Sequence, residues 1–228
     1  VNEQLNDLEE YMEEMQTIAE LAKKYDAYVV TDEVYEHIVY APNKHIYMQA
    51  LEGMRERTIV CNSLSKTYSI TGWRLGYVIA NPQIIDRVKK VHDFLTVGAA
   101  APLMEAAVVG LEFGDGYYDE LAAQYAHMKE VFVGGLKKLG LKYTDPQGAY
   151  YVLVDVSEFG VKDDVKFCEW MAQYVGVAAV PGSSFFREDV HNLVRFHFAK
   201  QDDTLNEAIK RLATLKEKVM NAKNVDWR

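Results

Sequence analysis

Short apolar, β-branched runs alternate with segments of helical periodicity in the first half of this chain. Three such runs lie at residues 27–31, 57–62 and 75–80. Apolar side chains recur at helical spacing around them, over residues 7–25, 84–94 and 102–113. Alternating strands and helices are typical of an α/β fold, in which helices cover both faces of a mostly parallel sheet. The pattern therefore predicts an α/β domain built on a mostly parallel sheet.

The pattern changes after the break at Gly114-Asp115-Gly116. A long helix is expected from 117 to 139, ended by Gly140. Strands are then expected at 150–154, 177–180 and 193–198, and helices at about 162–174 and 203–222. These elements predict an α+β unit. We therefore place residues 1–115 in a first domain and residues 116–228 in a second, α+β domain.

Charge and cysteine content exclude several classes of protein. The chain has 25 Lys and Arg against 34 Asp and Glu, a net charge of −9, so it is a poor general ligand for nucleic acid or an anionic membrane. No apolar run approaches the roughly 18 residues of a membrane-spanning helix. Cys61 and Cys168 form no disulfide framework, and no metal-ligand spacing is present. We expect a cytoplasmic protein without a metal site.

One polar loop carries the residues best suited to chemistry. Ser63 and Ser65 precede Lys66 by three residues and by one, and Arg74 follows eight residues later, with a glycine two positions away on each side. Hydroxyls and a forked guanidinium are suitable ligands for a phosphate group. A lysine removed from water can form a Schiff base with an aldehyde. Together these groups indicate pyridoxal 5′-phosphate (PLP) as the cofactor.

A second set of candidate residues follows the run at 27–31. PLP needs an acidic partner for its pyridinium nitrogen, because protonation there makes the ring an electron sink. Asp32 ends this run, and Tyr35 could bond the phenolic oxygen of the ring. Carboxyl ends of parallel strands gather at one edge of a sheet, where ligands bind. We therefore expect Asp32 and Lys66 to share such an edge.

At this point the sequence resembles a known family. The segments Asp32-Glu33-Val34-Tyr35 and SLSKTYSITGWRLG (63–76) are similar to the class I/II aminotransferases of PLP fold type I. Three later segments match as well, at residues 146–151 (PQGAYY), 180–185 (VPGSSF) and 194–199 (VRFHFA). The resemblance implies part of the fold type I large domain, over residues 1–115, followed by the small domain, over residues 116–228.

The resemblance also assigns roles to single residues. It implies that Lys66 bonds PLP as a Schiff base and moves the proton of the substrate α-carbon, with Asp32 on the pyridinium nitrogen. It implies that Arg195 grips the substrate α-carboxylate with a bidentate fork. The remaining implied ligands of the cofactor bind its ring oxygen (Tyr35) and its phosphate (Ser63, Arg74 and, more weakly, Ser65).

The implied activity is transamination between an L-amino acid and a 2-oxo acid, by an enzyme that is a homodimer. The family has about half its length before the segment that this chain resembles, so we expect a C-terminal part that lacks the N-terminal half. Two alternatives stay open. A PLP-dependent C–S β-lyase of the same fold would use the same residues, and an aminotransferase-like domain could be catalytically inert.

Overall fold

The computed structural model describes the backbone of residues 2–223 and 225–228, and the side chains of residues 11–223 and 225–228. The chain forms two compact units, which meet between Ala122 and Ala123. This point lies within the long helix α5 (Asp115–Lys138). The boundary predicted from the sequence, between residues 115 and 116, falls at the start of that helix and stays a prediction.

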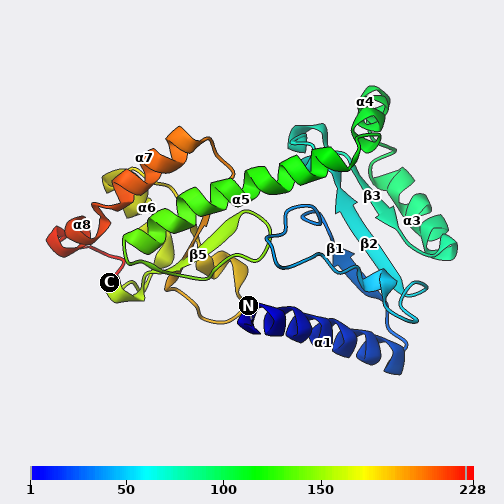
Figure 1. Cartoon of the computed structure of the whole chain (residues 1–228), viewed down its shortest axis with the longest axis horizontal. Coiled ribbons are helices and arrows are strands. Elements are labelled where there is room, and N and C mark those ends of the chain that lie inside the picture. The colour runs from blue at the N-terminus through cyan, green and yellow to red at the C-terminus, as the bar shows by residue number, and fades with distance from the viewer. Residues whose placement is uncertain (1, 224) are drawn as a thin grey trace. The chain divides into compact units, whose positions relative to one another are not determined.

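The first unit contains a three-stranded sheet, coloured blue to cyan in Figure 1, with the order β1 (Val29–Asp32), β2 (Thr58–Ser63), β3 (Gly76–Ile79). Strands β1 and β2 are parallel, as the sequence predicts, and β3 is antiparallel to β2. The chain between β2 and β3 holds only one turn of helix, α2 (Leu64–Thr67), and a 3₁₀ turn, η2 (Thr71–Trp73). Because a parallel return needs a longer crossover, β3 runs back along β2.

The antiparallel return of β3 brings its first residue beside the last residue of β2. Ser63, the last residue of β2, is in register with Gly76, the first residue of β3, and Asp32 is in register with Cys61. The carboxyl ends of β1 and β2 and the start of β3 therefore lie at one edge of the sheet. Both expected chemical segments are attached to this edge.

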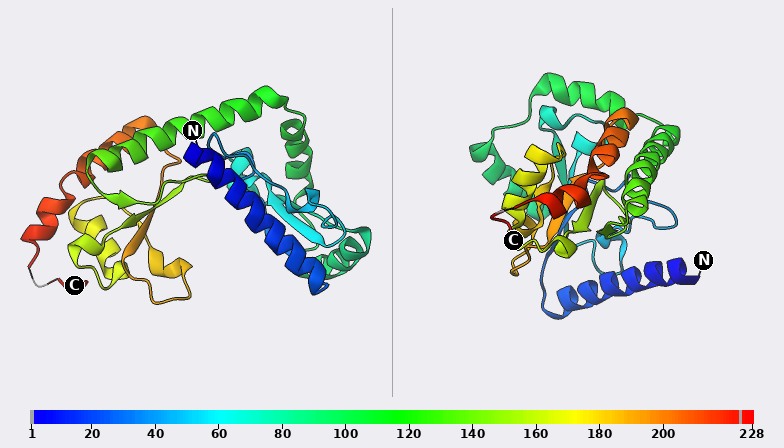
Figure 2. Two further views of the ribbon diagram at one scale, coloured as in Figure 1. Left: turned by 60° about the horizontal axis from the view of Figure 1, so that its bottom comes forward. Right: turned by 90° about the vertical axis from the view of Figure 1, so that its left-hand side faces the viewer.

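Helix α1 (Asn2–Lys24) packs on the first unit through small side chains. Ala19 and Ala22 are buried against Met48 and Met54, of which Met48 begins the 3₁₀ turn η1 (Met48–Ala50). Small residues on one helix face allow this close approach, and Figure 2 shows α1 alongside the strands of its unit. Two further helices, α3 (Pro82–Leu95) and α4 (Ala101–Leu111), complete the unit.

The second unit is built on an antiparallel four-stranded sheet. Its order is β4 (Lys142–Tyr143), β5 (Tyr151–Asp155), β7 (Leu193–His197), β6 (Val180–Pro181). Burial alternates along β5 and β7, so that Val152, Val154, Val194 and Phe196 enter the core. Arg195 therefore lies on the opposite face of β7 from Phe196.

Helices surround this sheet. Phe132 of α5 packs on Phe196 of β7, with ring centroids 5.7 Å apart. Helix α6 (Asp164–Tyr174) contacts β6 and β7. The helix predicted at 203–222 is two helices, α7 (Asp202–Leu212) and α8 (Leu215–Asn221). The Thr214 hydroxyl donates to the Arg211 carbonyl at the break, while buried Leu212 and Leu215 continue the apolar spacing through it.

Within the part of the chain that the structure describes, no helix combines the length and the apolar character needed to cross a bilayer.

The start of β3 predicts a stability effect. A Cβ atom at Gly76 would lie 2.7 Å from the Asn62 carbonyl oxygen, whereas a Cβ at Gly72 meets nothing within 4 Å. We expect Gly76→Ala to lower the free energy of unfolding by about 1–3 kcal/mol, because the β2–β3 ladder must shift. Gly72→Ala is the matched control, expected within about 0.5 kcal/mol of wild type. Equal urea midpoints for the two variants would contradict the close approach.

The contact between α5 and α7 predicts a pH effect. His127 Nε2 lies 2.9 Å from Asp202 Oδ2, and this hydrogen bond raises the pKa of His127 above its ordinary value of 6.5. The stabilisation is complete below pH 6.5 and is lost as pH rises through the raised pKa. We expect a small fall in the melting temperature across that range, absent in His127→Gln and retained in His92→Gln, a control on α3. A wild-type slope equal to that of His127→Gln would refute the linkage.

Candidate active site

The chain turns directly from β2 into α2 at Ser63. The Ser63 backbone is extended, and its Oγ accepts a hydrogen bond from the Ser65 backbone N–H at 3.1 Å, which caps the short helix. This turn places half-buried Lys66 just beyond the end of the strand. The sequence prediction that Lys66 follows a strand end is confirmed by this arrangement.

The two serine hydroxyls predicted as phosphate ligands lie together. Ser63 Oγ and Ser65 Oγ are 2.6 Å apart, and Ser63 Oγ also lies 3.0 Å from the Leu75 carbonyl oxygen. The Leu64 N–H donates to the same carbonyl at 3.2 Å. The serine turn is therefore tied to the segment that carries Arg74.

Arg74 has a left-handed backbone, with φ of 58°. Its Nη1 donates to the Thr71 carbonyl at 2.9 Å, and the Thr71 hydroxyl donates to the Ser65 carbonyl at 3.2 Å. These bonds hold the guanidinium segment beside the serine turn. The close approach at Gly76 is to the chain's own Asn62 carbonyl, so this glycine is required by the β2–β3 junction itself.

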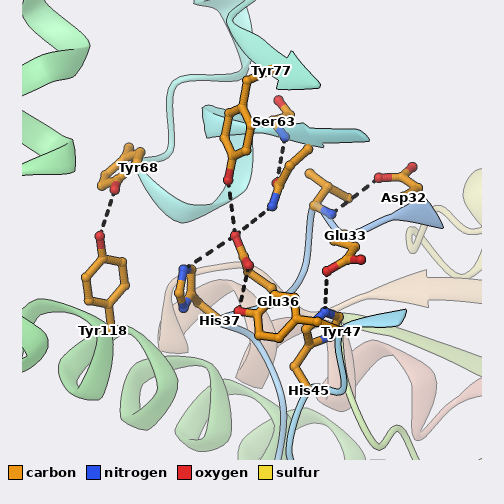
Figure 3. A network of polar contacts seen from close by, with 12 residues as sticks. Asp32, Glu33, Glu36, His37, His45, Tyr47, Ser63, Tyr68, Tyr77 and Tyr118 are labelled. Atoms are coloured by element: carbon orange, nitrogen blue, oxygen red, sulfur yellow. Dashed lines mark hydrogen bonds and ion pairs between the residues drawn. The ribbon is translucent and has the colours of Figure 1, made fainter. Parts of the chain in front are cut away.

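Asp32 and Tyr35 lie at the carboxyl end of β1. The exposed Asp32 carboxylate accepts from the Val34 N–H at 3.3 Å, as Figure 3 shows. Tyr35 is half-buried in the turn that follows, where its carbonyl accepts from the Ile38 N–H at 2.8 Å. Asp32 thus ends the strand that is paired in parallel with the strand leading to Lys66, as the sequence predicts.

Sequence reasoning did not single out Glu36, which is the centre of the polar network in Figure 3. Its carboxylate accepts from Tyr47 Oη at 2.8 Å, from Asn62 Nδ2 at 2.6 Å and from Tyr77 Oη at 3.4 Å. Burial and the Glu36 charge raise the pKa of Tyr77 to about 12. The Asn62 side chain accepts in turn from the Ser63 N–H at 2.7 Å, so the network reaches the serine turn.

A second carboxylate, Glu33, is 4% exposed and fully engaged. It accepts from the Thr31 hydroxyl at 2.8 Å and lies 2.8 Å from His45 Nε2 (Figure 3). Burial of a carboxylate is costly unless donors surround it. Apart from Thr31, the hydrogen-bond partners of the Glu33 and Glu36 carboxylates lie 11 or more residues away. The sequence signal is the acidic pair that follows Asp32 within four residues.

Tyrosines of α5 support α2 from its far end. Tyr117 Oη donates to the Thr67 carbonyl at 2.7 Å, and Tyr68 Oη lies 2.9 Å from Tyr118 Oη. The Tyr68 and Tyr117 rings are stacked, with centroids 5.7 Å apart. Helix α2 is therefore held at both ends, which restricts the position of Lys66 within it.

Arg195 belongs to the second unit, where aromatic rings flank it. Its Cζ lies 4.2 Å from the Tyr151 ring centroid and 3.7 Å from that of Phe185. Both distances are within the range of cation–π attraction. Its Nε is buried and has no hydrogen-bond partner among the described residues. A buried donor of this kind is suited to an anionic ligand.

The donor set of the first unit fits the cofactor expected from the sequence. Paired hydroxyls and a nearby guanidinium segment suit the phosphate of PLP, and Lys66 supplies an amine beside them. The Asp32 carboxylate on the neighbouring strand supplies the acidic group that a pyridinium nitrogen requires. The residues present are therefore chemically compatible with PLP.

Comparisons with known proteins agree with this arrangement. The family model for aminotransferase class I and II matches residues 12–212. A relative from Mycobacterium tuberculosis, a probable N-succinyldiaminopimelate aminotransferase, is 35% identical over 215 residues, which cover 90% of this chain and 54% of the relative. The methionine aminotransferase of Escherichia coli is 36% identical over 192 residues, covering 84% of this chain and 50% of that enzyme.

Solved structures give the same result. The structure of N-succinyldiaminopimelate aminotransferase from Mycobacterium tuberculosis superposes with a TM-score of 0.85 at 34% identity, covering 90% of this chain and 54% of that one. The chain spans about half the length of the curated relatives it matches. Enzymes of this class are PLP-dependent transaminases, and the α/β fold is theirs. The chain belongs to the class I and II aminotransferase family.

Proposed function

We propose that this chain forms the lysine-bearing and carboxyl-terminal part of an amino acid aminotransferase. The reaction is the transfer of an amino group between an L-amino acid and a 2-oxo acid. The observation that carries the proposal is the serine turn at the end of β2, tied to the Arg74 segment and followed at once by Lys66. Family membership supports the same reaction.

Each candidate residue of the first unit is assigned to one chemical group of the cofactor. Ser63, Ser65 and Arg74 hold the phosphate, and Asp32 holds a proton on the ring nitrogen while Tyr35 bonds the ring oxygen. When bound, PLP supplies an electron-withdrawing ring conjugated to the reacting carbon. Lys66 Nζ would be the amine that holds the cofactor. Once the amino group of the substrate has displaced it, the free Lys66 amine would accept the proton of the substrate α-carbon.

Arg195 binds the substrate. A guanidinium fork makes two parallel hydrogen bonds to a carboxylate, and every amino acid presents that group at its α-carbon. The relatives are named for different substrates, among them N-succinyldiaminopimelate, methionine and kynurenine. We therefore propose the class of substrate, L-amino acid with 2-oxo acid, and no particular side chain.

We further propose that the enzyme works as a homodimer in the cytoplasm. The homodimer is supported by the family, because aminotransferases are typically dimeric. The cytoplasmic location is supported by two free cysteines, one half-buried and one buried, because disulfides are rare in reducing compartments.

PLP binding tests the role of Lys66. We expect the chain mixed with PLP to gain an absorbance band that borohydride makes permanent, with the added mass on the peptide that contains Lys66. Lys66→Ala should lose the mass, and Lys90→Ala, a change at an exposed lysine of α3, should keep it. In the active enzyme that contains this chain, Lys66→Ala should lower kcat by at least about 10²–10⁴-fold. Near-normal transamination by that variant would refute the proposal.

The products separate the two reactions open to this fold. Transamination yields a 2-oxo acid and a new amino acid in equal amounts. A C–S β-lyase acting on a cysteine conjugate yields pyruvate, ammonia and a thiol. Release of ammonia and thiol without a new amino acid would replace the proposed reaction by the lyase.

Arg195→Lys tests the grip on the α-carboxylate. Lysine keeps the charge but loses the two parallel hydrogen bonds, so we expect kcat/KM to fall by about 10–100-fold for all amino acids together. PLP retention and reaction with an amine that lacks a carboxylate should not change. Kinetics with three unlike amino acids and one such amine provide the measurement. A loss confined to one amino acid would assign Arg195 to a side chain instead.

A further inference from the structure

The turn η4 (Gly182–Phe185) of the second unit supplies one of the two rings on Arg195. Phe185 lies at the end of this turn, with its ring centroid 3.7 Å from Arg195 Cζ. The side chain is 47% exposed, so its own burial does little to fix it. Something else must hold the turn against the arginine.

The first end of the turn is fixed by the sheet. Strand β6 pairs with β7, with Val180 opposite Arg195 and Pro181 opposite Val194. A Cβ at Gly182 would lie 2.6 Å from the Leu193 carbonyl oxygen, so the chain leaves the strand in close contact with β7.

The rest of the turn is held by a buried carboxylate on another element. Asp164, in the first turn of α6, is 0% exposed. Its oxygens accept from the Ser183 N–H at 2.7 Å and from the Ser183 hydroxyl at 2.8 Å, and one lies 3.3 Å from His191 Nδ1. Burial alone would raise the pKa of Asp164, but the two bonds from Ser183 together with His191 outweigh it and keep the pKa below its ordinary range. Asp164 is thus an ionised group facing the loop.

Capping of α6 does not explain this carboxylate. The cap is the preceding residue, Asp163, whose side chain accepts from the Lys166 N–H at 3.0 Å. A carboxylate withdrawn from water is costly unless hydrogen bonds or ion pairs compensate it. The hydrogen-bond partners of Asp164 among the described residues all lie between 183 and 191, so its task is to hold that loop.

We propose that Asp164 is a positioning residue for Arg195: through Ser183 it fixes η4 so that Phe185 orients the guanidinium for a carboxylate ligand. The chain of contacts runs from Asp164 to the Ser183 N–H and hydroxyl, then along the turn to Phe185, and from its ring to Arg195. The assignment of the ligand as the substrate α-carboxylate rests on the proposed function.

Ser183 offers the sharper variants, because a change at fully buried Asp164 could prevent folding. Ser183→Ala removes the hydroxyl bond, and Ser183→Thr retains a hydroxyl. Ser184→Ala makes the same substitution one residue on, at an exposed position of the same turn. Phe185→Leu removes the aromatic ring and shows how the Arg195 guanidinium behaves without the Phe185 contact.

The first measurement needs neither cofactor nor turnover. In the ¹⁵N-arginine-labelled chain, the Nε–Hε resonance of Arg195 is assigned by its loss in Arg195→Lys. We expect Ser183→Ala to move this resonance toward its position in Phe185→Leu, and Ser183→Thr and Ser184→Ala to leave it unchanged. A resonance that does not move in Phe185→Leu, or that moves there but not in Ser183→Ala, overturns the proposal.

The second measurement uses the active enzyme. We expect Ser183→Ala to raise KM for unlike amino acids together by about 3–10-fold, with kcat changed less than KM, and Ser183→Thr to restore it. A shifted resonance with an unchanged KM would refute the positioning role. If Arg195→Lys itself spares amino acid turnover, the proposed function of Arg195 fails, while the resonance still reports whether Asp164 and Ser183 hold the ring.

Discussion

The junction between the end of β2 and the start of β3 determines the geometry of the first unit. One carbonyl, that of Leu75, accepts both the Leu64 N–H and the Ser63 hydroxyl. Gly76 makes this possible, because only a residue without a Cβ can lie so near the Asn62 carbonyl. If this junction opened, the serine turn would lose its two hydrogen bonds to the Leu75 carbonyl, and the Arg74 segment would separate from it.

The Glu36 carboxylate stabilises the same edge of the sheet. Glu36 accepts hydrogen bonds from Asn62 of β2, from Tyr77 of β3 and from Tyr47 in the segment after β1. The Asn62 side chain in turn accepts from the Ser63 N–H. Such a fully satisfied network is rigid, whereas the loss of one member leaves a half-buried charge. The site is thereby built on a rigid edge.

Residues near in sequence were predictable, and residues brought together by the return of the chain were not. Lys66 and Asp32 could be placed at strand ends because each follows an apolar run, and the motif around Lys66 indicated the family. The antiparallel direction of β3 was not predicted. It follows from the short connection between β2 and β3, which holds only the single helical turn α2 and the 3₁₀ turn η2. Glu36 and Asp164 were missed, and Ser183 was noted only as part of the segment 180–185, because the hydrogen bonds that give these residues their roles join positions 11 or more residues apart.

The two proposed anion sites are built differently in a chain whose net charge is −9. In such a field a cation is readily paired with a neighbouring carboxylate, which would leave it little capacity for a ligand. The serine turn avoids this with neutral hydroxyl donors beside Arg74. Aromatic rings, and not a carboxylate, lie against the Arg195 guanidinium. They attract the cation without occupying its N–H groups. The buried, unpaired Nε of Arg195 is the direct result of that choice of neighbours.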